Sequence, residues 1–373
     1  MQSESNVLPP VVMLVIDRLT NPHAGTEGQF ILLVRQLLTA GVSVQAMILD
    51  HSSWLHQHGL PCPYTVIGRS SLKNPLTWFY VFKNIWRAKK NGVKVAHIFF
   101  NDASVICPPI FKLFGIKNII SRRDMGFWYN NLYRMILPLT GRCVDLVISN
   151  SQAVSQITQQ VERLPTKKMH VIYNGFDRAP AAEKQIPELE NIAHDGGIML
   201  GLVANIRPIK RIQDAIAALA LLPQRNMLHL VVIGAGEPAE LQALSHKLNV
   251  AGRVHFLGSR ADVPDCLRYF SAGLLCSESE GFSNSIVEYQ FAGLPVICSR
   301  TGGNPEAVET GETGWLYDVA DVQVLAKCID ELISNPEAAK SMGVQAKKVA
   351  AERYSVNKML ENHLAVYAEL VGN

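Results

Sequence analysis

The sequence is poor in the features that mark disulfide-bonded, membrane-spanning and metal-binding proteins. Its seven cysteines are scattered along 373 residues, and no two have the Cys-x-x-Cys spacing of zinc and redox sites. We therefore expect reduced thiols and a cytoplasmic protein. The first apolar run, Val11 to Ile16, is too short for a signal-peptide core or a membrane span. The chain also lacks an Asp-x-Asp triplet, and we predict no metal site.

Apolar residues make up 48% of the chain and charged residues 18%, which is typical of a soluble globular protein and not of a disordered one. A length of 373 residues suits two domains of roughly 150 to 190 residues, each able to bury its own core.

Charge is unevenly distributed along the chain. Residues 1–175 carry 18 Lys and Arg against 8 Asp and Glu, whereas residues 176–373 carry 17 against 24. A basic half suits a polyanionic partner such as an anionic membrane surface or a lipid-linked phosphate. The acidic half argues against nucleic acid covering the whole molecule. We predict no nucleic-acid partner, with peripheral attachment to the inner face of the plasma membrane as one interpretation.

Short Val- and Ile-rich runs alternate with longer segments of helical period, which predicts βαβ units and parallel sheets. Two doubly wound α/β domains follow, at residues 1–178 and 198–355, joined by a linker at 179–197 where proline interrupts the pattern. Open α/β sheets bind ligands outside the carboxyl ends of their strands. We therefore expect two Rossmann-like domains facing a central cleft. The expected strands are Val11–Ile16, Ser43–Leu49, Val95–Phe99, Asn118–Ile120, Leu146–Ile148, Met169–Ile172, Met199–Val203, Leu228–Ile233, Val254–Phe256, Gly273–Cys276 and Pro295–Cys298.

An acidic stretch follows one predicted buried strand and opens a helix. Gly281 lets the backbone bend closely around a ligand, and the amides from Phe282 to Ser285 form a helix N-terminus that attracts phosphate. Glu280 and Glu288 then stand on either side of a diphosphate, where a sugar and a ribose present hydroxyl groups. An acidic loop before an ordinary amphipathic helix is the structural alternative.

Glu280-Gly-Phe-Ser-Asn-Ser-Ile-Val-Glu288, followed by Phe291-Ala-Gly-Leu-Pro-Val, resembles the retaining glycosyltransferases of family four, which have the GT-B fold. The resemblance extends over most of the chain and includes Val254 to Gly258, Thr301 to Glu306 and Gly311 to Gly314. It implies transfer of a sugar from a nucleotide sugar, with UDP favoured because the family uses it most often. The nucleotide sugar is a substrate, and no cofactor is implied.

The resemblance also implies a role for each domain and for individual residues. The first domain would bind a saccharide or lipid-linked acceptor in cell-surface polysaccharide or glycan synthesis, the second would bind the donor, and residues 356–373 would form a helix that packs back on the first domain. Glu280 would orient the donor sugar, and Glu288 would bind the ribose. The donor-binding set comprises Gly25, Thr26, Asn205, Gly258, Gly281, Phe282, Ser283, Asn284, Ser285 and Glu288.

Positive charge for the leaving diphosphate is expected from Arg207 and Lys210, in the turn after the strand Met199–Val203. The family usually has arginine where this chain has Asn205, so Arg207, two residues further along the chain, would take the role of that arginine. A solvated basic helix start is the structural alternative.

In the first domain, Gly25 and Thr26 belong to a loop that resembles the family's phosphate-facing N-terminal loop. Arg123 stands where many members carry histidine, which suggests an anionic group on acceptor or donor, with Asp124 holding the arginine. His97, Asn101 and Asp124 are candidates for the acceptor side. Ordinary turn, surface and core roles are the alternatives for these residues.

The segment from Leu76 to Lys90 is an aromatic and basic helix candidate. Its aromatic residues suit either core packing or a lipid headgroup interface.

Two further enzyme classes are disfavoured. Gly234-Ala-Gly236 resembles a dinucleotide fingerprint, but the next strand lacks the acidic residue that binds ribose. Gly281-Phe-Ser-Asn-Ser285 lacks the second glycine of a hydrolase elbow. A non-catalytic nucleotide-sugar-binding protein and a sugar-nucleotide epimerase on the same fold remain as alternatives.

Overall fold

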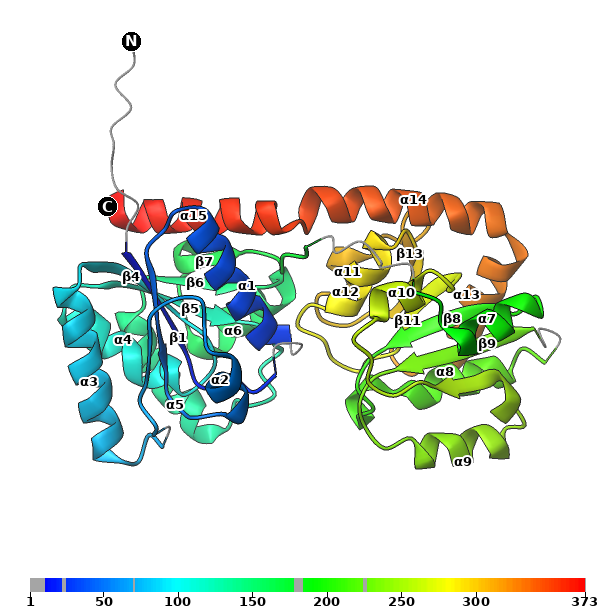
Figure 1. The fold of residues 1–373 in the computed structure, drawn as a ribbon, viewed down its shortest axis with the longest axis horizontal. Coiled ribbons are helices and arrows are strands. Elements are labelled where there is room, and N and C mark those ends of the chain that lie inside the picture. Colours follow the sequence, from blue (N-terminus) through cyan, green and yellow to red (C-terminus); the bar gives the residue numbers. More distant parts are fainter. Residues whose placement is uncertain (1–10, 22–24, 70, 178–183, 224–226, 373) are drawn as a thin grey trace, which may run out of the picture. The chain divides into compact units, whose positions relative to one another are not determined.

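The structure is a computed structural model that describes residues 11–21, 25–69, 71–177, 184–223 and 227–372. Residue contacts divide the chain into two units (Figure 1). Unit 1 contains the residues up to Gly175 together with those from Val356 onward, and unit 2 contains Phe176–Ser355. Each unit is a parallel sheet with helices on both faces, as the alternation of strand and helix patterns predicts.

Unit 1 has a seven-stranded sheet in the order β3-β2-β1-β4-β5-β6-β7, and all neighbours are parallel. Its strands are β1 (Val11–Ile16), β2 (Val44–Ile48), β3 (Tyr64–Val66), β4 (Val93–Ile98), β5 (Lys117–Arg122), β6 (Leu146–Ser149) and β7 (Met169–Val171). Its helices are α1 (Gly25–Thr39), α2 (Ser53–His58), α3 (Pro75–Lys90), α4 (Ala103–Leu113), α5 (Asn131–Thr140), α6 (Gln152–Glu162) and α15 (Val356–Gly372), with short turns η1 (Gly141–Cys143) and η2 (Thr166–Lys168).

The central strand β1 shows how unit 1 builds two cores. Val12 and Leu14 face a cluster with α1 and α15, whereas Met13 and Val15 face a cluster with α3 and α4. Successive strand residues point to opposite faces, so a strand covered on both sides is apolar throughout. In Figure 1, α15 lies beside α1, and both elements contribute to one core.

Unit 2 has a six-stranded parallel sheet in the order β10-β9-β8-β11-β12-β13. Its strands are β8 (Ile198–Val203), β9 (Leu228–Ile233), β10 (Val254–Phe256), β11 (Ala272–Leu275), β12 (Val296–Ser299) and β13 (Gly314–Tyr317). Its helices are α7 (Pro187–His194), α8 (Ile212–Ala220), α9 (Ala239–Lys247), α10 (Val263–Leu267), α11 (Asn284–Phe291), α12 (Asn304–Ala307), α13 (Val322–Ser334) and α14 (Pro336–Arg353), with short turns η3 (Pro208–Lys210) and η4 (Ala251–Arg253).

Three elements are absent from the sequence-based expectation, namely the edge strands β3 and β13 and the helix α7. The edge strand β3 is only three residues long and largely exposed, so it has no buried apolar run. The edge strand β13 begins at Gly314. The expected linker contains α7, whose Leu189 is buried, while residues 178–183 of that region lie outside the described residues. The described part of the chain contains no helix that combines the length and apolarity needed to span a bilayer.

Candidate active site

The start of α11 is anchored at the carboxyl end of β8. The hydroxyl of Ser285 donates to the carbonyl of Val203 at 2.6 Å, and the amide of Val203 donates to the hydroxyl of Tyr289, also at 2.6 Å. Ser283 is the N-cap residue and is buried. These contacts hold the first turn of α11 at the edge of the sheet where α/β proteins bind ligands, and the N-terminus of a helix attracts anions.

Glu280 and Lys210 form an ion pair just ahead of this helix. The Nζ of Lys210 lies 2.5 Å from Oε1 of Glu280, and the hydroxyl of Ser277 donates to the same oxygen at 2.6 Å. The side chains are only 12% exposed at Glu280 and 24% at Lys210. A largely buried carboxylate with a cation and a hydroxyl on one oxygen is held in one orientation, and its second oxygen remains to accept a hydrogen bond.

A pair of glycines supports the backbone of Glu280. Gly302 has a φ of +49°, and a Cβ built on it would lie 1.6 Å from the carbonyl oxygen of Glu280. The amide of Gly303 donates to that same carbonyl at 3.3 Å. No side chain fits at residue 302, so the Thr301-Gly-Gly motif brings the loop after β12 against the glutamate. Its resemblance to the family is clear from the sequence, but this contact is not.

Glu288 lies on α11, half-buried. Burial raises the pKa of its carboxyl from 4.5 to about 7. No residue among those the structure describes forms an ion pair with it. A desolvated carboxyl without a cation is a candidate ligand-binding group, because hydroxyl donors on a ligand would stabilise its ionised form.

The turn after β8 presents the other donor-side residues. Asn205 accepts a hydrogen bond from the amide of Ala235 at 3.1 Å through its side-chain oxygen, which links this turn to the glycine-rich turn after β9. The carbonyl of Gly258 accepts from the amide of Gly234 at 2.8 Å. Arg207 is exposed at the start of η3. Asn205 and Gly258 therefore connect loops, and Arg207 extends into solvent.

The N-terminal loop of unit 1 is held by a carboxylate. Glu27 accepts hydrogen bonds from the hydroxyl of Thr20 at 2.9 Å and from the amide of Asn21 at 2.7 Å. Gly25 and Thr26 form the first positions of α1, where backbone amides are free of helical partners. Residues 22–24 of this loop lie outside the described residues.

Arg123 lies at the end of β5, but Asp124 does not hold it. The guanidinium of Arg123 donates to the side-chain oxygen of Asn174 and lies over the ring of Phe99 at 5.9 Å. Asp124 accepts instead from the amide of Gly126 at 2.7 Å and the indole of Trp128 at 3.0 Å. Burial lowers the pKa of Arg123 to about 10, so it remains a cation at neutral pH.

His97 is a packing residue in this structure. It is fully buried, with Nδ1 2.8 Å from the hydroxyl of Tyr367 and Nε2 2.7 Å from the hydroxyl of Ser121. Burial lowers its pKa well below the usual range, so the ring is neutral. Both ring nitrogens are engaged, and this geometry does not support the expected acceptor-side role. Tyr367 belongs to α15, so His97 helps to hold that helix on the sheet.

Asn101 also takes part in a structural contact. The amides of Asn101, Asp102 and Ala103 donate to the carboxylate of Asp17 at 3.1, 3.0 and 2.7 Å. Asp17, at the end of β1, thereby caps the start of α4. Burial raises its pKa to about 7. Only the side chain of Asn101 remains for a ligand.

A buried polar network beside Arg123 is not evident from the sequence. Arg122 donates to Glu162 at 2.6 Å and to the hydroxyl of Ser104 at 2.9 Å, and Tyr129 donates to the same Glu162 at 2.6 Å. The two adjacent arginines have different partners, since Arg122 contacts Glu162 and Ser104 whereas Arg123 contacts Asn174.

Two family profiles match the chain. The profile described as Glycosyl transferases group 1 matches residues 187–349, and the one described as Glycosyltransferase Family 4 matches residues 24–179. Among curated proteins, the N-acetyl-alpha-D-glucosaminyl L-malate synthase of Bacillus anthracis is 27% identical over 300 residues, which are 76% of this chain and 77% of that protein.

Solved structures share the fold. A glycosyltransferase from Rickettsia africae superposes with a TM-score of 0.85 at 18% identity, covering 98% of this chain and 99% of that one. HepE of Anabaena in complex with UDP gives a TM-score of 0.82 at 20% identity, covering 96% and 99%, and the same protein has been solved with UDP-glucose. With both halves matched by these profiles and both sheets shared with these structures, the chain belongs to the family-four glycosyltransferases and has the GT-B fold.

Proposed function

We propose that this glycosyltransferase is a metal-independent, retaining hexosyltransferase that moves a sugar from a UDP-sugar to a saccharide acceptor, carried on a lipid. The observation that carries the proposal is the Lys210–Glu280 pair directly ahead of the N-terminus of α11. A cation and the N-terminus of a helix suit a diphosphate, and an oriented carboxylate beside them suits the hydroxyl groups of a sugar.

Each donor-side group then has a distinct role. The amides at the start of α11 and the ammonium of Lys210 hold the diphosphate, while the exposed Arg207 adds positive charge. Glu280 accepts hydrogen bonds from the sugar through its remaining oxygen. Glu288 accepts hydrogen bonds from the ribose hydroxyls, which favour its ionised form. The helix N-terminus and the lysine supply the charge that a metal ion would otherwise provide.

The reaction breaks the bond between the anomeric carbon and the phosphate oxygen. The acceptor hydroxyl forms the new bond to that carbon on the same face, and its proton passes to the departing diphosphate. No protein nucleophile is required, so electrostatic stabilisation of the leaving group carries much of the rate. UDP as carrier is supported by the bound UDP and UDP-glucose in HepE of Anabaena. Arg123 is proposed to face an anionic group of the acceptor or donor.

The test is turnover of a panel of nucleotide sugars with lipid-linked saccharides, with and without a chelator, followed by NMR assignment of the product anomer. A retained anomer with chelator-insensitive turnover supports the proposal. A product with the inverted anomer contradicts the retaining mechanism, and loss of turnover in the presence of chelator contradicts metal independence. Donor binding without transfer or hydrolysis would instead indicate a binding protein, and isomerised nucleotide sugar without acceptor would indicate an epimerase.

The helix α3 supports attachment to a membrane surface. Its buried residues are Thr77, Val81, Ile85 and Ala88, so core packing uses only one narrow face. We call the remaining apolar surface the α3 aromatic face, which consists of the exposed residues Leu76, Trp78, Phe79, Tyr80, Phe82 and Trp86. The same helix carries Lys83, Arg87, Lys89 and Lys90. Exposed aromatic rings among basic side chains are typical of helices that lie in the headgroup region of anionic bilayers.

A further inference from the structure

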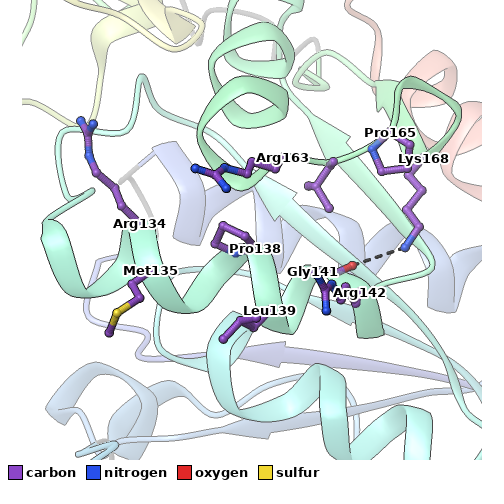
Figure 2. Close-up of a pocket in the computed structure, with 10 residues that line it drawn as sticks. Arg134, Met135, Pro138, Leu139, Gly141, Arg142, Arg163, Pro165 and Lys168 are labelled. Carbon is purple, nitrogen blue, oxygen red and sulfur yellow. Dashed lines mark hydrogen bonds between the residues drawn. The ribbon is translucent and has the colours of Figure 1, made fainter.

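Unit 1 contains a cavity of about 620 Å³ between the ends of α5 and α6. Its walls come from α5, η1, the residues after α6, and η2 (Figure 2). Four of its lining residues are cations, and none is acidic. The lining residues are Arg134, Met135, Pro138, Leu139, Gly141, Arg142, Arg163, Leu164, Pro165 and Lys168.

The cavity is separate from the candidate active site of unit 1. The turns η1 and η2 directly precede β6 and β7, so the cavity lies at the amino ends of these strands. Arg123 and Asn174 follow the carboxyl ends of β5 and β7, at the opposite edge of the same parallel sheet. A group bound in the cavity therefore does not occupy the acceptor or donor position.

The cationic side chains of the cavity are not neutralised by ion pairs. No acidic side chain in the described ranges pairs with Arg134, Arg142, Arg163 or Lys168. The charge of Asp145 raises the pKa of Lys168, but this carboxylate is engaged elsewhere. It accepts a hydrogen bond from the amide of Asn118 at 2.9 Å and lies 3.9 Å from the ammonium of Lys117. Arg134, Arg142 and Arg163 are exposed and Lys168 is half-buried, so water screens their mutual repulsion, and a bound anion would gain charge-assisted hydrogen bonds from them.

Their geometry also leaves donors available. Toward the residues that the structure describes, the side chain of Arg134 donates only through Nε, at 3.4 Å from the carbonyl of Tyr129, so its terminal amino groups remain available. Lys168 donates to the carbonyls of Gly141, at 3.3 Å, and Val144, which leaves one of its three protons. Burial lowers the pKa of Lys168, so an anion nearby would favour its charged form. Figure 2 shows Arg134 and Arg163 toward one end of the cavity and Arg142 with Lys168 toward the other.

We infer that this cavity binds a phosphate ester, either as a soluble compound or as the headgroup of an anionic phospholipid. Arginine forks pair with phosphate oxygens through two parallel hydrogen bonds, and this volume is that of a small-molecule site. Met135 and Leu139 are exposed at the cavity wall, at 65% and 58%. They provide apolar surface next to the cations, as the part of a lipid beyond its phosphate requires.

The experiment is calorimetric titration of the full chain with sn-glycerol 3-phosphate, together with flotation on phosphatidylcholine vesicles with and without phosphatidylglycerol. The test variant is Arg134→Gln/Arg142→Gln. The matched control, Arg35→Gln/Lys340→Gln, removes the same charge from exposed positions outside the cavity. Arg134→Lys/Arg142→Lys retains the charge, and thermal unfolding confirms that each variant is folded.

We expect saturable binding that weakens at least about tenfold in the test variant and remains in the control, the scale of one lost charge-assisted hydrogen bond. The lysine variant should bind better than the glutamine variant. Binding must persist in Lys210→Gln, which separates this cavity from the proposed donor site. If the test variant loses binding only to sn-glycerol 3-phosphate, the ligand is a free phosphate ester. If it loses binding only to phosphatidylglycerol vesicles, the ligand is a lipid. No binding by the native chain, or equal losses in test and control variants, overturns the inference.

Discussion

The ammonium of Lys210 lies 2.5 Å from a carboxylate oxygen of Glu280, and the two residues come from different loops of unit 2. Sequence reasoning assigns the lysine to a diphosphate and the glutamate to a sugar, as separate contacts. The structure joins them in one ion pair. A change at either residue therefore acts on both.

We expect Lys210→Ala to lower kcat by about 100- to 1,000-fold, because the leaving diphosphate loses a cation and Glu280 loses its partner. Lys210→Arg should recover part of the activity, since the charge is retained. Steady-state kinetics with the best donor measures both effects. Unchanged kcat in Lys210→Ala would remove the lysine from the mechanism.

Replacing Glu280 and replacing Glu288 should affect different kinetic quantities. Glu280→Ala should reduce turnover more than donor affinity, because the sugar loses its orienting group. Glu288→Ala should chiefly weaken donor binding, because only the ribose contact is lost. Calorimetric donor affinity and kcat are measured for each variant. Equal losses of donor affinity with unchanged turnover in both would contradict this division.

Glu288 should also make stability depend on pH. Its pKa rises from 4.5 to about 7 on folding, so the folded chain binds the proton more tightly than the unfolded chain. The contribution of this group to stability is therefore lost as pH rises from about 5 to 7. Glu288→Gln should lack this component. Urea unfolding at pH 5, 6, 7 and 8 tests it, and parallel curves for native and variant chains would refute it. Burial also raises the pKa of Asp17 to about 7, but this residue is present in both the native chain and the variant, so its contribution cancels in the comparison.

Gly302→Ala should destabilise the chain more than Gly311→Ala. Both glycines have positive φ, so the backbone strain is similar. A Cβ at residue 302 meets the carbonyl of Glu280 at 1.6 Å, whereas a Cβ at residue 311 has no described atom within 4 Å. We expect a difference of about 1 to 3 kcal/mol in unfolding free energy, with lower kcat for Gly302→Ala only. Equal stabilities would show that the loop simply moves aside.

The α3 aromatic face should contribute strongly to vesicle binding. Phe79→Ser/Trp86→Ser removes two exposed rings from it, and we expect at least about tenfold weaker binding to phosphatidylglycerol vesicles, since each buried ring contributes about 1.5 to 3 kcal/mol. Leu221→Ser/Val344→Ser removes exposed apolar side chains from unit 2 as a control. Vesicle flotation measures both. Equal binding by the two variants would exclude α3 as the attachment surface.

The fold is largely predictable because its central strands are covered on both faces. Val11–Ile16 and Leu228–Ile233 are β1 and β9, because strands covered on both faces are predominantly apolar and His229 is the one polar residue in these two segments. The edge strand β3 escapes prediction because its side chains are mostly exposed. Prediction therefore succeeds where burial dictates residue type.

The candidate site is predictable as a set of residues and not as a set of contacts. Spacing alone identifies Glu280, Glu288 and the intervening helix start. It cannot show that Asn174, 51 residues beyond Arg123, replaces Asp124 as the arginine's partner. That contact depends on β5 and β7 lying on either side of β6, a property of the sheet order.

The last helix completes the core of the first unit. Met359, Val366 and Tyr367 of α15 pack with α1 and β1, and the hydroxyl of Tyr367 contacts His97 across 270 residues of sequence. Residues 176–355 are continuous, so the core of unit 2 needs no residue beyond Ser355. Unit 1 gains the last part of its core only once α15 has been synthesised, and a chain that stops before Val356 leaves the apolar faces of α1 and β1 uncovered there.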